Sequence, residues 1–408
     1  MHKGAMNKVE RARSTTDWTF PDRTTIRAYY VGMFLYWGAL YVYSPILSVY
    51  AQSLGASFTT VGMVVGAYGF VQMWLRIPLG VWSDRLGRRL PFLYAGHFFN
   101  LVGCLGLAMA PTPMYLVVFR GVLGISAATW VAFTVLFASY FPSDQSPKAM
   151  GVVTAINGIS LIVVNGFGGQ IAQMWGMGAT FYVGAALAAM GLIATVPIKE
   201  HRATHKPPTF RQIWRIITHP ALMIVALITA LNHYSFWATT FGFIPVHAAN
   251  IGASKLALGI IGVAALVPYT LTAPMNHHFA ARLGENRAAS VGIMVMAATM
   301  FVVPLIKNIP LLAVAQGVSG FGRGLVYPLL MGLSIREIAG EDRATAMGVF
   351  QAVYAIGMFL GPMTAGVVAD AVGLSGAFII AGTVSVIAAA AALTLLGRTN
   401  DLSKRGRV

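Results

Sequence analysis

Charged residues are scarce in this chain of 408 residues. Asp, Glu, Lys and Arg make up only 10% of it, whereas 57% is hydrophobic and the mean hydropathy is +0.71. A soluble domain carries about 25% charged residues, so the composition excludes an ordinary soluble protein and indicates a membrane protein. Cysteine is almost absent as well. The single Cys104 excludes an internal disulfide and any cysteine-based metal cluster.

Acidic residues are the rarer charged group, with 12 against 28 Lys and Arg. All of them fall in expected tails, loops or span ends, and none lies in the middle of an apolar run. The sequence also lacks a catalytic cluster: it has no paired carboxylates at depth, no nucleophile elbow and no phosphate-binding loop. The pair His277-His278 is too small for a metal site. We therefore expect no enzyme activity, no cofactor and no metal.

The net charge of +16 raises the question of a nucleic-acid partner. The basic residues are spread over separate loops rather than along one basic face, so we expect no such partner. The expected partners are a small-molecule substrate, the lipid bilayer and protons as a coupling ion, and we expect a monomer.

Long apolar runs predict the fold. About 20 apolar residues cross a bilayer as one helix, and twelve such runs centre near residues 40, 70, 100, 126, 160, 188, 233, 267, 297, 322, 357 and 386. We predict an all-α membrane protein with twelve transmembrane helices. An even number of spans places both termini on the same side of the membrane.

The distribution of Lys and Arg predicts which side that is. With the termini inside, the outside loops contain only Lys255 and Lys307, and most of the other basic residues lie in inside segments. Such a bias is the positive-inside signal. We expect a multi-pass protein of the bacterial inner membrane with both termini in the cytoplasm.

The two halves of the chain repeat each other. Leu54-Gly55-Ala56-Ser57 recurs as Ile251-Gly252-Ala253-Ser254, and Arg85-Leu86-Gly87 recurs as Arg282-Leu283-Gly284, both 197 residues later. Parallel repeats of six helices place a substrate site near the bilayer midplane between the halves. The expected units are a cytoplasmic tail (1–26), a six-helix bundle (27–198), a cytoplasmic linker (199–219), a second bundle (220–396) and a tail (397–408).

A dense charge cluster lies between the second and third runs. Gly80-x-x-x-Asp84-Arg85-x-Gly87-Arg88-Arg89 resembles the loop signature of the major facilitator superfamily, and Arg120-Gly121-x-x-Gly124 is similar to a second signature of that family. Drug exporters of that family carry a third signature, rich in glycine and proline, on the fifth helix. The corresponding segment here, Asn165-Gly166-Phe167-Gly168-Gly169, keeps the glycines but lacks the proline, and a more complete version, with the proline, lies in the eleventh span at Gly357–Gly366. The resemblance covers nearly the whole chain and implies two pseudo-symmetric six-helix bundles that work by alternating access.

The first signature is expected to be a conformational latch that helps close the cytoplasmic side. Gly80 is expected to pack the second span against the eleventh. Asp84 is expected to accept hydrogen bonds from its own loop arginines or from a helix N-terminus across the halves. The alternative is that the segment only marks topology and contacts lipid headgroups. The latch residues are Gly80, Asp84, Arg85, Gly87, Arg88 and Arg89.

Charges inside the membrane are costly unless paired or hydrated, so they point to function. The resemblance implies that spans 4 and 10 line the central cavity, which makes Arg120 and Arg323 candidates for contact with substrate or coupling ion; the alternative is that each bonds neighbouring groups and only shapes the cavity. Arg76 is near enough to the inner end of span 2 to snorkel, and we interpret it as structural. An unperturbed histidine titrates near neutral pH, which makes His233 a candidate proton carrier; the alternative is a neutral structural histidine.

Aromatic and amide side chains complete the predicted substrate or coupling site. Rings can stack on a flat, partly apolar substrate, although some of them must face lipid. These further candidates are Trp37, Tyr41, Asn157, Asn232, Trp237, Tyr327 and Tyr354.

The predicted function is secondary active transport of a small organic molecule. The first choice is proton-coupled efflux of a drug-like compound or metabolite, which rests on the two signatures and the aromatic spans. The alternative is a symporter or exchanger for an organic or inorganic anion, favoured by two buried arginines and no acid in the membrane. A receptor or enzyme on a transporter fold is disfavoured because the tails are too short for an output domain.

Overall fold

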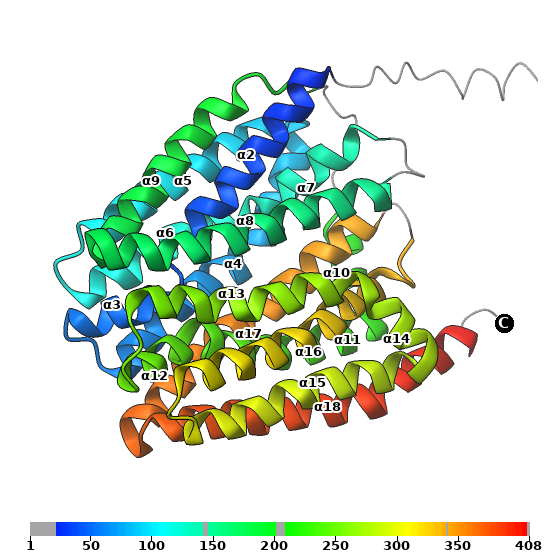
Figure 1. The fold of residues 1–408 in the computed structure, drawn as a ribbon. Helices are drawn as coiled ribbons and strands as arrows, with labels where there is room; N and C mark the ends of the chain where they lie inside the picture. The colour runs from blue at the N-terminus through cyan, green and yellow to red at the C-terminus, as the bar shows by residue number, and fades with distance from the viewer. Residues whose placement is uncertain (1–21, 142–145, 201–208, 340–341, 406–408) are drawn as a thin grey trace, which may run out of the picture.

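The structure is a computed structural model that describes residues 22–141, 146–200, 209–339 and 342–405. These residues form helices joined by turns, without a strand among them. Every predicted span centre lies inside a helix. Figure 1 shows the helices lying roughly along one direction in two groups, with the N-terminal group, blue to green, beside the C-terminal group, green to red. The prediction of an all-α membrane fold with two bundles is confirmed.

The N-terminal bundle contains six spans, two of which are each divided between two helices. Its helices are α2 (Arg23–Tyr41), α3 (Leu47–Ser53), α4 (Phe58–Leu86), α5 (Leu90–Ala108), α6 (Pro113–Ala128), α7 (Trp130–Ser139), α8 (Ser146–Trp175) and α9 (Met177–Thr195).

The C-terminal bundle follows a short helix, α10 (Phe210–Ile217), in the expected linker. Its seventh span contains a π-helical segment, its eighth contains a short 3-10 turn between two helices, and its ninth ends in another 3-10 turn. Its elements are α11 (Pro220–Phe236), η1 (Trp237–Phe243), α12 (Ile244–Asn250), α13 (Lys255–Thr272), η2 (Ala273–Met275), α14 (Asn276–Leu283), α15 (Glu285–Val302), η3 (Val303–Leu305), α16 (Ile309–Ile335), α17 (Arg343–Val372) and α18 (Leu374–Arg405).

The first span is less apolar than the others. Eleven helices in the described part of the chain are long and apolar enough to cross a membrane, and the remaining span is formed by α2, which packs against α8 and α9. Arg23 and Arg27, together with its tyrosines and Trp37, lower its hydropathy. The helix ends at Tyr41 and gives way to a turn that contains Pro45 before α3 begins. A proline interrupts helical hydrogen bonding, which accounts for the break.

Side-chain caps set several helix starts. Ser57 accepts a hydrogen bond from the amide of Thr60 at the start of α4, and Ser254 does the same for Ala257 in α13. Asp22 caps α2, where hydrogen bonds from Thr25 and then Lys199 hold the pKa of its carboxyl well below the usual range. These caps satisfy amides that have no partner inside the helix.

We call the two ends of the molecule the terminal face, where α2 begins and α18 ends, and the far face, which carries α3 and α12 (Figure 1). The boundaries of the predicted tails and linker remain predictions. Residues 1–21, 201–208 and 406–408 of those segments lie outside the described residues.

The bundles touch closely on the far-face side of α4 and α17. A β-carbon at Gly69 would lie 2.7 Å from the side chain of Met358, and one at Gly66 would lie 2.9 Å from the carbonyl oxygen of Phe359. The expectation that Gly80 makes this contact is wrong in this structure. A β-carbon built at Gly80 would lie 3.9 Å from the side chain of Val131, in its own bundle, and would meet no atom of α17 within 4 Å among the described residues. Glycines nearer the far face make the close approach instead, which small residues permit.

Candidate functional site

The latch segment, residues 80–89, is mostly helical rather than a loop. The helix α4 continues through Arg85 to Leu86, and Gly87 ends it with a φ of +62°, a left-handed conformation that glycine adopts without strain. Arg85 and Arg88 are exposed, whereas Arg89 is buried.

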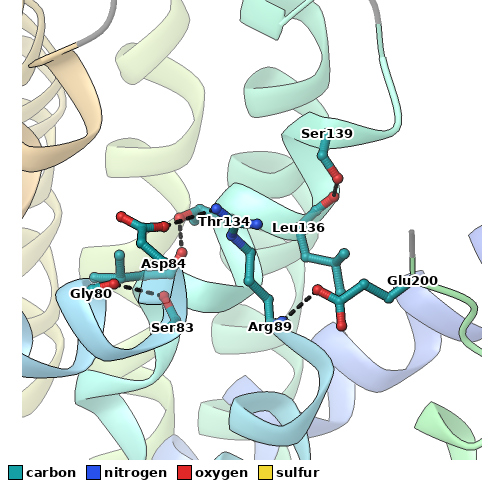
Figure 2. Close-up of polar contacts among 9 residues, drawn as sticks. Gly80, Ser83, Asp84, Arg89, Thr134, Leu136, Ser139 and Glu200 are labelled. Carbon is teal, nitrogen blue, oxygen red and sulfur yellow. Dashed lines mark hydrogen bonds and ion pairs between the residues drawn. The ribbon is translucent and has the colours of Figure 1, made fainter. Parts of the chain in front are cut away.

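Asp84 is paired within its own bundle. Its Oδ1 accepts a hydrogen bond from the guanidinium of Arg89 at 2.9 Å, which is one of the two arrangements expected from the sequence. Figure 2 shows this pair together with Glu200, whose carboxylate accepts hydrogen bonds from the backbone amides of Arg89 and Leu90 at the start of α5. Sequence reasoning missed Glu200, because it lies 111 and 110 residues from the two amides that it binds.

Arg120 lies in an aromatic cage inside the N-terminal bundle. The side chain is buried on α6, and its Nη1 donates to the hydroxyl of Tyr43 at 2.9 Å. Its guanidinium lies 4.3 Å from the ring centroid of Tyr68, a cation–π distance. Its buried Nε has no hydrogen-bond partner in the part of the chain that the structure describes. Arg120 therefore has neighbours that stabilise its charge within one bundle.

Arg323 lies at the wall of a cavity between the bundles. Its guanidinium carbon is 3.3 Å from the ring centroid of Phe236 and 5.0 Å from that of Tyr269. Within the described residues it makes no hydrogen bond or ion pair. The cavity wall is mainly apolar, with polar side chains from α8 and α16. Its polar residues other than Arg323 include Ser44, Asn165, Thr240, Tyr269, Gln316 and Ser319.

His233 belongs to an aromatic cluster on α11, α16 and α17. Its ring stacks on Tyr354 with centroids 4.4 Å apart and lies 5.3 Å from Tyr327. Its Nδ1 is 3.1 Å from the carbonyl oxygen of Thr229. Since a carbonyl only accepts, Nδ1 donates this hydrogen bond, and in the neutral ring Nε2 then keeps its lone pair.

Arg76 connects this cluster to the other bundle. It is buried, it bonds Gln72 on its own helix and Gln351 on α17, and its guanidinium lies 5.7 Å from the ring of Tyr354. Arg76 therefore does not snorkel to the inner surface, because two glutamine side chains bond it in place, and the interpretation of Arg76 as structural stays a prediction. Neither glutamine was singled out from the sequence.

The other predicted residues are divided between the bundle interface and the bundle interiors. Trp237 stacks on Tyr68 across the interface, with centroids 5.3 Å apart, and Tyr41 lies 5.6 Å from Phe241. Trp37 packs on Trp130 inside its own bundle, and Asn232 faces the sulfur of Met296.

Asn157 is half-buried on α8 and does not line the cavity. Asn165 and Gln316, which do line it, were not predicted as site residues. The polar character of both in apolar spans was the available signal, and Asn165 also begins a glycine-rich run.

These features define a membrane transporter with a central cavity between two six-helix bundles. The family model of the Major Facilitator Superfamily matches residues 29–247 and 225–407. The chain belongs to this superfamily, and it is a multi-pass transporter rather than an enzyme.

Similar proteins include two bacterial drug-resistance proteins and one solved transporter. The multi-drug resistance efflux pump PmrA homologue of Lactococcus lactis is 21% identical, over 86% of this chain and 89% of its own. Multidrug resistance protein 1 of Bacillus subtilis is 24% identical, over 80% and 85%. A bacterial homologue of the human lysosomal transporter Spinster, solved inward-facing and occupied, superposes with a TM-score of 0.76 and 16% identity over 91% and 96%.

Proposed function

We propose that this transporter carries a small organic molecule with an anionic group beside a flat apolar part. The observation that supports this proposal best is the environment of Arg323, a guanidinium at a cavity wall with aromatic rings but no acid or hydrogen-bond acceptor as partner among the described residues. A guanidinium offers five donors in a planar fork that fits a carboxylate or phosphate. A bound anion would supply the missing partner.

The apolar part of the substrate would lie against the rings of the same cavity. Phe236, Phe241 and Tyr269 line it together with aliphatic side chains. Aromatic faces at this position favour a planar, partly apolar ligand. The polar side chains of Asn165 and Gln316 would orient it by hydrogen bonds.

The proposed direction is export in exchange for protons. The names of the two drug-resistance relatives support export. The described membrane helices have no acidic side chain in their middle, so we propose His233, with its free Nε2 lone pair, as the proton carrier. The bias of Lys and Arg supports a cytoplasmic terminal face in a bacterial inner membrane. Since both bundles belong to one chain, we propose a monomer.

The test is a proteoliposome assay with imposed pH and voltage gradients that compares small aromatic carboxylates with cationic dyes. We expect carboxylate transport that falls at least tenfold in Arg323→Gln, because a hydrogen bond to a charged group contributes about 1.5–3 kcal/mol and 1.4 kcal/mol is tenfold. Arg323→Lys should retain part of it. The matched control is Arg287→Gln, an exposed arginine on α15, which should transport normally.

The second candidate is export of cationic or neutral drug-like compounds. It is favoured by the rings of Tyr41, Trp237 and Phe241, which contact one another in a chain at the bundle interface and could hold a cation over their faces. Dye transport that is insensitive to Arg323→Gln would establish this candidate and overturn the anion proposal.

A further inference from the structure

At the far face, a carboxylate of one bundle binds a helix N-terminus of the other. Asp370, in the last turn of α17, accepts hydrogen bonds from the backbone amides of Phe58 at 3.0 Å and Thr59 at 2.8 Å, each through a different oxygen. These amides open α4 and have no partner inside their helix. An anion at a helix N-terminus is stabilised by the unpaired amides and the helix dipole.

The same contact recurs in the other half of the repeat. Gln173, which is 197 residues before Asp370, lies at the end of α8, and its Oε1 accepts a hydrogen bond from the amide of Lys255 at 3.2 Å. Lys255 opens α13 and is the repeat partner of Phe58. Each bundle therefore sends one side chain to a helix start of the other bundle, and only one of the two is charged.

Close backbone packing brings both pairs of helices together beside these contacts. A β-carbon at Gly169 would lie 2.8 Å from the carbonyl oxygen of Lys255. A β-carbon at its repeat partner, Gly366, would lie even closer to the carbonyl oxygen of Phe58. The contacts are thus possible only while α4 is packed on α17 and α13 on α8. Opening of the far face would break all of them.

The terminal face has no comparable contact at its glycines. Among the described residues, no atom of the other bundle lies within 4 Å of where a β-carbon of Gly80, Gly151 or Gly348 would be. Asp84, the carboxylate of the latch segment, is paired within its own bundle. The described structure is therefore closed at the far face.

We propose that Asp370 and Gln173 form a two-armed clasp that holds the far face shut, and that the charged arm, Asp370, sets how readily this face opens during transport. Asp370 is a positioning residue and does not touch the cavity. Its arm is the stronger because a charged acceptor forms hydrogen bonds about twice as strong as a neutral one. The clasp goes beyond the proposed substrate and is independent of it.

The experiment measures access to the cavity from the far face. The native Cys104 is buried. We therefore introduce a single reactive thiol with Thr240→Cys, which a membrane-impermeant maleimide can label. Thr240 lies at the cavity wall and makes no hydrogen bond in the described structure. Right-side-out and inverted vesicles are compared, and Lys307→Cys, exposed in a far-face loop, identifies the vesicles in which the reagent meets that face. The parent chain without either new cysteine measures background labelling.

Two clasp variants should shift the labelling rate in opposite directions. Asp370→Asn removes the charge and one acceptor, and we expect labelling of Thr240→Cys about tenfold faster, whereas Asp370→Glu should be nearer the parent rate. Gln173→Glu places a second charge on a helix N-terminus, and we expect labelling several-fold slower. The slower rate is a result that simple damage to the fold would not give.

The control is Glu285→Gln at the start of α15, which breaks the ion pair with Arg336, the residue that follows α16. It should leave labelling unchanged. Size-exclusion profiles verify that every variant is folded. Parent-like labelling in Asp370→Asn, or faster labelling in Gln173→Glu, would overturn the clasp. The assay contains no substrate, so its outcome does not depend on the cargo proposed above.

Discussion

At the scale of single residues, two arginines that both lie within membrane spans have different surroundings. Arg120 donates to the hydroxyl of Tyr43 inside one bundle, whereas Arg323 lines the cavity between the bundles with rings as its neighbours. The sequence predicts that both lie in the membrane and have similar roles. The apolar run around an arginine indicates its depth, but only the packing of distant helices decides whether a hydroxyl reaches it.

His233 gives a prediction at the same scale. His233→Gln keeps an amide donor for the carbonyl of Thr229 but removes the nitrogen that can bind a proton. We expect the variant to lose accumulation of substrate driven by a pH gradient, while downhill flux remains within about twofold, because coupling and binding use different groups. Transport in proteoliposomes with and without a pH gradient measures both quantities.

The matched control is His247→Gln, since His247 bonds a backbone carbonyl, that of Ile306, in the same bundle. It should keep coupled transport. If His233→Gln still concentrates substrate against its gradient, His233 does not carry the coupling proton.

At the scale of helices, the sequence predicts the spans well and their contacts poorly. All twelve span centres are correct because apolar length is a local property of the chain. The positions at which Glu200 meets Arg89, and Asp370 meets Phe58, are separated by 111 and 312 residues. No local pattern marks such pairs. The prediction of a loop at residues 80–89 is also wrong for its first part. The charged residues there indicate a loop, but α4 continues to Leu86.

Glu200 gives the prediction at this scale. Glu200→Gln removes the charge from the N-terminal amides of α5, and we expect the free energy of unfolding to fall by about 0.5–2 kcal/mol, the usual contribution of a helix cap. Thermal unfolding of the purified protein in detergent measures the change. Glu337→Gln, a half-buried glutamate without a hydrogen bond in the described structure, is the control, and equal midpoints for the two variants would contradict the cap.

At the scale of the whole molecule, the repeat is symmetric in backbone and asymmetric in charge. The far face carries one charged and one neutral arm, Asp370 and Gln173. The terminal face carries Asp84 in one half, while the corresponding loop in the other half, residues 282–287, lacks that aspartate. Each face therefore carries a carboxylate that its repeat partner lacks, and these two carboxylates belong to opposite bundles. Alternating access requires that the two faces are not open together.

This arrangement predicts opposite effects for the two carboxylates. We expect Asp84→Asn to impair transport severalfold without changing membrane insertion, because a latch without its charge holds the closed terminal face less well. The Asp84→Asn variant should therefore favour the conformation that is closed at the far face, and far-face labelling of Thr240→Cys should be slower. Asp370→Asn should accelerate the same labelling.

Free-energy effects at distant sites usually add, so the double variant should label at a rate near that of the parent. A double variant that labels as fast as Asp370→Asn alone would show that Asp84 does not set this equilibrium, and parent-like transport by Asp84→Asn would remove the latch altogether.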